Sequence, residues 1–95
     1  MNETKTAVFG VHFTKPPAKG TICVLGAKDA TGRWLGGVIV PTGVRSFCAR
    51  ATLIMGPGQK ALPTLWFQNA VAAKRTCEFD SFYMQPDWVQ EENIA

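Results

Sequence analysis

The sequence predicts a small, mainly β domain, a coiled sheet or partly open barrel that is OB-like at most. Its 95 residues are enough for one domain, and 46% of them are hydrophobic, as in a folded globular protein. Several segments alternate between apolar and polar side chains, which is the period of a half-buried strand. Short stretches rich in Gly and Pro separate these segments, as turns do. This fold includes one possible helix near residues 62–75, and an α+β fold is the alternative.

The alternating segments predict five strands, over residues 4–13, 21–28, 33–40, 44–55 and 76–84. In the first strand, Ala7, Phe9, Val11 and Phe13 share one face, which is expected to be buried. In the fourth strand, one face carries Arg45, Phe47, Ala49, Ala51, Leu53 and Met55. The expected domain covers residues 1–84, and residues 85–95 form an acidic C-terminal segment.

A tight turn is expected at Asp29-Ala30-Thr31-Gly32, because Asp can cap its own backbone and Gly can adopt a positive φ. This turn joins the second and third strands into a hairpin. The pair Gly36-Gly37 lies in the middle of the third strand, where it indicates a bulge or a sharp coil.

The segment 61–75 is ambiguous, and a helix is favoured. Pro63 lies near its start, alanines fill its second half, and Lys74-Arg75 suit the C-terminal end of a helix dipole. A strand is less favoured here because Leu65, Trp66 and Phe67 are three bulky residues in a row. In either case, Trp66 and Phe67 are interpreted as a pair that packs in the core.

Two short motifs do not establish a function. Residues 66–69 read WFQN, which resembles the start of a homeodomain recognition helix, but three helices are required and the upstream segments read as strands. Residues 56–61 read GPGQKA and fit a dinucleotide-binding loop, but Pro63 would interrupt the helix that must follow.

Catalysis, metals, cofactors and membranes are not expected. The single histidine, His12, is interpreted as a solvated or cross-strand residue. The cysteines Cys23, Cys48 and Cys77 form no C-x-x-C pair and are interpreted as reduced thiols of core type in a cytoplasmic protein. No signal peptide or membrane-spanning segment is recognised.

Charge is segregated along the chain. Residues 1–77 hold all ten Lys and Arg but only two acids, whereas residues 78–95 hold five acids and no Lys or Arg. A basic body attracts polyanions, and an acidic segment can occupy the same surface when none is bound. The sequence therefore predicts an autoinhibitory or partner-docking C-terminal segment, carried by Asp87, Trp88, Glu91 and Glu92.

Basic residues alternate with aromatic ones on the expected strands and loops. Proteins that bind single-stranded nucleic acid use this combination, with cations on phosphates and rings stacked on bases. The favoured function is therefore that of a small, non-enzymatic protein that binds single-stranded DNA or RNA. The candidate contacts are Lys15, Lys19, Lys28, Arg33, Trp34, Arg45, Phe47, Arg50 and Lys60.

A different class of function stays open. A small β-rich assembly or inhibitor protein, such as a virion component, a phage accessory protein or a blocker of a host factor, would act through protein–protein contacts. A homo-oligomer is expected in either case. Salt dependence separates the two classes, because counterion release weakens nucleic-acid binding steeply as salt rises.

Overall fold

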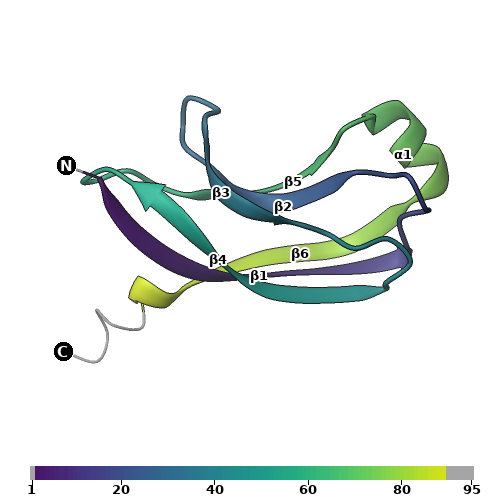
Figure 1. Ribbon diagram of the computed structural model, residues 1–95, viewed down its shortest axis with the longest axis horizontal. Coiled ribbons are helices and arrows are strands. Elements are labelled where there is room, and N and C mark those ends of the chain that lie inside the picture. The colour runs from purple at the N-terminus through teal and green to yellow at the C-terminus, as the bar shows by residue number, and fades with distance from the viewer. Residues whose placement is uncertain (1, 90–95) are drawn as a thin grey trace.

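The computed structural model describes residues 2–89 and is mainly β, as the sequence predicts (Figure 1). The described chain contains six strands and one helix of two turns. In chain order they are β1 (Glu3–Lys15), β2 (Cys23–Lys28), β3 (Trp34–Ile39), β4 (Ser46–Met55), β5 (Leu62–Phe67), α1 (Ala70–Thr76) and β6 (Glu78–Pro86). Residues 87–89 add a short helical turn.

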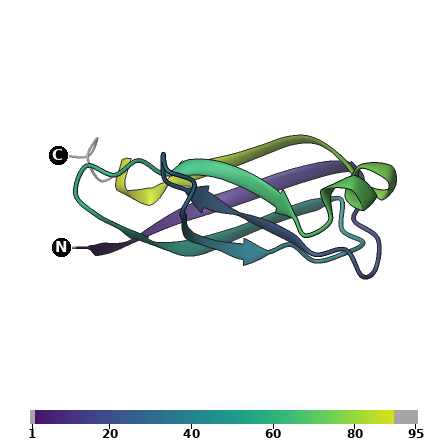
Figure 2. The ribbon, with the colours of Figure 1, turned by 90° about the horizontal axis from the view of Figure 1, so that it is seen from above.

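The strands form two antiparallel sheets of three strands each, in the orders β4-β1-β6 and β3-β2-β5. The sheets lie one over the other and do not close into a barrel (Figures 1 and 2). The core lies between them and is built around Phe9 and Phe13 of β1, Leu25 of β2 and Leu53 of β4, all fully buried. The alternation expected for residues 4–13 is confirmed, because Ala7, Phe9, Val11 and Phe13 are all buried.

At one edge of the sandwich, the two sheets approach closely at a glycine. β3 packs along β4, although no hydrogen-bond ladder joins them. A Cβ atom on Gly36 would collide with the carbonyl oxygen of Thr52 in β4. Only a residue without a side chain allows this approach, so Gly36 lets the two sheets meet at this edge.

The hairpin of β2 and β3 forms as predicted. The Asp29 carboxylate accepts hydrogen bonds from the backbone N–H of Thr31 (2.9 Å) and of Arg33 (3.0 Å), and Gly32 has a φ of 89°. The Asp29 carboxylate also accepts a hydrogen bond from the Thr31 hydroxyl, which is the largest cause of a pKa of Asp29 below its ordinary value. The two backbone bonds lower this pKa further. The expected irregularity lies at Leu35, beside the Gly36-Gly37 pair, where the register with β2 shifts.

The predicted helix over residues 62–75 is wrong in its first half. β2 has one edge not covered by β3, and Leu62–Phe67 pairs with it as the edge strand β5. Pro63 is tolerated because an edge strand needs fewer donors. The helix begins only after Asn69, whose side chain accepts a hydrogen bond from Ala72 N at 3.0 Å, and it ends at Thr76.

The last strand extends beyond its expected end at residue 84. β6 continues through Gln85 and Pro86, which pair with Val8 and Ala7 of β1. These two residues therefore belong to the sheet.

Replacing Gly36 by Ala should destabilise the fold by about 1–3 kcal/mol, the usual cost of overpacking. The added methyl group meets backbone, which cannot move without separating β3 from β4. Urea unfolding followed by circular dichroism measures the loss.

Gly10→Ala is the matched control. Its Cβ would meet the Tyr83 ring, which is a half-exposed side chain that can swing outward. A Gly36→Ala protein no less stable than Gly10→Ala would contradict the role assigned to Gly36.

Candidate functional site: a tryptophan hollow on the outer sheet face

The outer face of β3-β2-β5 is organised in three cross-strand rows. Paired residues on neighbouring strands point to the same face of a sheet. The three rows, each in the order β3, β2, β5, are Ile39–Val24–Trp66, Gly37–Gly26–Thr64 and Trp34–Lys28–Leu62. The middle row has two glycines and the outer rows each carry a tryptophan, so the face is low in its centre and high at two sides.

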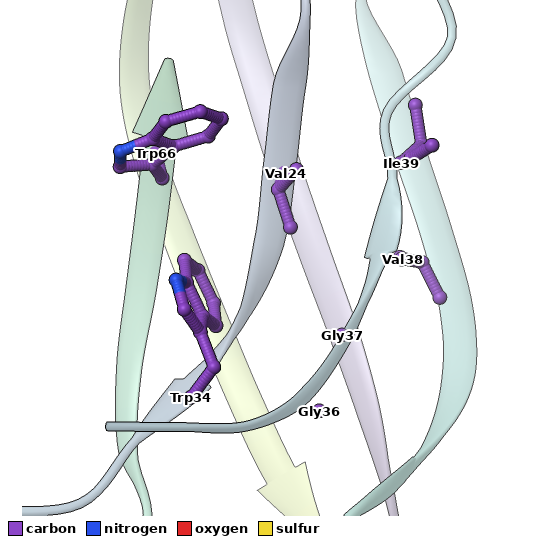
Figure 3. A pocket seen from close by; sticks show the side chains of 7 residues that line it. All are labelled: Val24, Trp34, Gly36, Gly37, Val38, Ile39 and Trp66. Atoms are coloured by element: carbon purple, nitrogen blue, oxygen red, sulfur yellow. The ribbon is translucent and has the colours of Figure 1, made fainter. Parts of the chain in front are cut away.

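The glycines turn this low centre into a floor of bare backbone. A Cβ on Gly26 would lie 2.8 Å from Gly37 Cα and 3.0 Å from the Trp34 ring, and a Cβ on Gly37 would lie 2.8 Å from the Leu25 carbonyl oxygen. The resulting hollow has a volume of about 330 Å³. We call it the tryptophan hollow; it is lined by Val24, Trp34, Gly36, Gly37, Val38, Ile39 and Trp66 (Figure 3).

Both indole rings are accessible at the hollow. Trp34 is 38% exposed and Trp66 is 39% exposed. In Figure 3 the two indoles lie on one side of the hollow, with Val38 and Ile39 on the other side and Val24 between. Trp side chains combine a large apolar ring with a polar N–H group and are enriched at interfaces. Two of them on one open face therefore indicate a contact surface.

A cation accompanies the rings. The Lys28 ammonium lies 5.0 Å from the centroid of the Trp34 ring, within the range of a cation–π contact. Arg33 precedes β3 directly and Lys60 lies two residues before β5, and both are exposed. Three candidate cations therefore lie on or beside the end of this sheet that carries Trp34.

The structure brings together only part of the predicted contact set. Lys28, Arg33, Trp34 and Lys60 lie at the tryptophan-hollow sheet. Arg50 lies on the outer face of the other sheet, where its Nε donates to the Asp87 carboxylate at 2.9 Å. Lys15, Lys19 and Arg45 belong to strand ends and loops near α1.

Phe47, a predicted stacking ring, is only partly exposed. It pairs with buried Val11 on β1 and packs against the core. The reverse holds for Trp66. It was predicted to pack in the core, and the structure has it on the outer face. The signal that could have identified it is the alternation of Leu62, Thr64 and Trp66, which share one face of β5.

The start of the acidic C-terminal segment is bound to the protein's own body. The Asp87 carboxylate accepts hydrogen bonds from the Thr6 hydroxyl (2.5 Å) and from Arg50. Trp88 packs against the core, with the Lys5 ammonium 5.3 Å from its ring centroid. Asp87 and Trp88 are therefore engaged within the chain, and their role in docking a partner stays a prediction. Glu91 and Glu92 lie outside the described residues.

The outer face of β4-β1-β6 has a second, more polar recess of about 280 Å³. The Tyr83 ring lies over Gly10, and its hydroxyl is 3.5 Å from Cys48 Sγ. His12 Nδ1 lies 2.8 Å from Asp80 Oδ1, which confirms His12 as a cross-strand residue and lowers the pKa of Asp80.

The cysteines are not uniform. Cys23 and Cys77 are buried, and burial raises the pKa of both thiols, that of Cys23 to about 12. They are protonated and poorly nucleophilic at neutral pH, as core thiols are. Cys48 is exposed, so its interpretation as a core residue is wrong.

Within residues 2–89, no three His, Cys, Asp or Glu side chains come together as a metal site. None of the helices described is long and apolar enough to cross a membrane. Comparisons with family models, with curated proteins and with solved structures give no match to this chain.

Asp87→Asn should make the stability of the protein less dependent on pH in the acid range. The Thr6 hydrogen bond, followed by that of Arg50, lowers the pKa of Asp87. A lowered carboxyl pKa stabilises the fold above the unfolded value of about 3.9, and this contribution is lost as the pH falls further. Denaturant unfolding at several values between pH 6 and pH 3 measures it.

Glu3→Gln is the control, because Glu3 is exposed and its partner Lys5 lies at 3.8 Å. If Asp87→Asn and Glu3→Gln changed the loss of stability between pH 6 and pH 3 equally, the docking role of Asp87 would be refuted.

Proposed function

We propose that this protein binds single-stranded nucleic acid on the outer face of β3-β2-β5. The observation that carries the proposal is the tryptophan hollow itself. Two partly exposed indoles lie on one side of a hollow whose lining includes Gly36 and Gly37, and a lysine lies against one of them. Flat rings on an open strand surface with adjacent cations are the combination that single-strand binders use.

The chemistry of the hollow suits an unpaired base. A base can lie flat on an indole, and the glycine floor leaves its edge close to backbone. Such stacking is worth about 1–3 kcal/mol per base and tolerates any sequence. Lys28, Arg33 and Lys60 are placed to meet the phosphates that link the stacked bases. Double-stranded nucleic acid would not fit this mode, because its base faces are already stacked on one another.

Protein–protein contact is the second candidate, and the apolar excess of the same face favours it. Ile39 is 72% exposed, Leu62 47% and Ile22 44%. Apolar patches of this kind also mark protein interfaces, including those between copies of one chain. Gel filtration of protein never treated with nuclease, read at 260 and 280 nm, reports both an oligomer and any carried nucleic acid.

Trp66→Ala should weaken binding to oligothymidylate by roughly 5- to 150-fold, the equivalent of one lost stacked base. Wild-type binding is expected to quench tryptophan fluorescence and to weaken steeply as salt is raised. Titration of a twelve-residue oligothymidylate at low salt, followed by fluorescence anisotropy of a labelled strand, measures the affinity.

Tyr83→Ala is the matched control, because Tyr83 is a half-exposed aromatic side chain on the opposite sheet. Equal losses for Trp66→Ala and Tyr83→Ala would argue against the hollow as the binding site. Absence of wild-type binding at low salt, together with an oligomer free of nucleic acid, would favour the protein-contact role.

A further inference from the structure

Five cationic residues gather at the end of the molecule that carries α1. They come from four separate parts of the chain: the end of β1, the loop after it, the loop before β4, and the last turn of α1. Figures 1 and 2 show these segments side by side at one end of the long axis, away from the N-terminus. We call this set the basic end; its members are Lys15, Lys19, Arg45, Lys74 and Arg75.

Hydrogen bonds tie these segments to one another. Lys15 Nζ donates to the carbonyl oxygen of Arg75 at 3.4 Å, which joins β1 to α1. Arg45 Nη1 donates to the Thr14 carbonyl oxygen at 2.7 Å, and Phe13 N donates to the Arg45 carbonyl oxygen at 2.6 Å. These bonds therefore join β1, the loop before β4 and α1, and they hold the side chains of Lys15 and Arg45 in place.

The basic end has little compensating negative charge. In the part of the chain that the structure describes, none of its five members forms an ion pair with a carboxylate. The nearest acid is Glu78, the cross-strand partner of Lys15, whose carboxylate accepts a hydrogen bond from the Thr14 hydroxyl, so among the described residues five cations meet one carboxylate at this end. Asp80 is engaged with His12. The described acids Glu3, Asp29 and Asp87 belong to other regions. A cluster of unpaired cations attracts a polyanion.

The tryptophan hollow and the basic end are connected along β5. Trp66 lies one residue before the end of β5, and the ladder with the β2 side continues through Gln68 N, which donates to the Ile22 carbonyl oxygen at 3.0 Å. A recess of about 200 Å³ follows directly, between this junction and α1. It is lined by Gly20, Thr21, Ile22, Gln68, Asn69, Ala72 and Ala73. Lys19 precedes the first of these residues, and Lys74 follows the last.

We propose that a single strand stacked in the tryptophan hollow continues over this recess, and that the basic end neutralises its phosphates. This inference rests on the proposed function and adds the course of the strand. The Trp34 and Trp66 rows are four residues apart along β2, about 13 Å, so the hollow takes only a few nucleotides. The molecule is 44 Å long. A strand of about twelve nucleotides lies within the range of site sizes known for small β domains.

The experiment compares a four-residue with a twelve-residue oligothymidylate over a series of salt concentrations. The variants are Lys74→Gln, Lys19→Gln and the double substitution. For the longer strand, log K falls as log salt rises. The steepness of this fall should become smaller by about 0.7 for each lysine removed. For the four-residue strand, the affinity and the slope should not change. Thermal unfolding verifies that each variant is folded, and Lys19, in a loop, provides the test if Lys74→Gln weakens α1.

Arg50→Gln is the single-charge control, because Arg50 lies on the outer face of the other sheet. It should leave both slopes unchanged. Wild-type binding of both strands with unchanged slopes in the double variant would overturn the proposed course. Equal losses in Arg50→Gln and Lys74→Gln would also overturn it, since the effect would then be general attraction. Failure of the wild type to bind either strand would instead refute the proposed function.

Discussion

The close approach of three backbones at Gly26, Gly36 and Gly37 is the constraint on which the rest of the structure depends. Gly36 lets β3 reach the Thr52 carbonyl on β4, and this contact joins the two sheets along one edge. Gly26 and Gly37, on paired strands, leave the outer face of the same sheet without side chains over β2 and β3 in its middle row. One cluster of small residues therefore shapes both the core edge and the hollow outside it.

The glycine cluster also explains why two tryptophans can remain exposed. Gly26 leaves room for the Trp34 ring to lie near β2, and Lys28 covers part of that ring. Trp66, at the other end of the hollow, is supported by Val24 beside it. The rings are thus held by the sheet on one side and are open on the other. Side chains held in this way lose less conformational entropy when a ligand binds.

The sequence predicted the elements whose burial follows a simple period. β1 and β4 alternate cleanly, and the hairpin turn at Asp29 carries its own capping chemistry, so local information was sufficient. β5 was missed because its strand character depends on pairing with β2, whose paired residues are 34 or more positions away in the chain. Phe47 and Trp66 were assigned to opposite environments from those observed, since the face that a strand buries is decided by the sheet behind it.

Charge shows the same limit. The cations precede the acids along the chain, yet the fold mixes them, because β6 returns beside β1. Asp80 then meets His12, and Asp87 meets Thr6 and Arg50, all on the β4-β1-β6 sheet. The described part of the C-terminal segment is therefore bound on the sheet opposite the tryptophan hollow. Asp87 pairs there with Arg50, so acids that follow the cations along the chain lie beside some of those cations in the folded sheet.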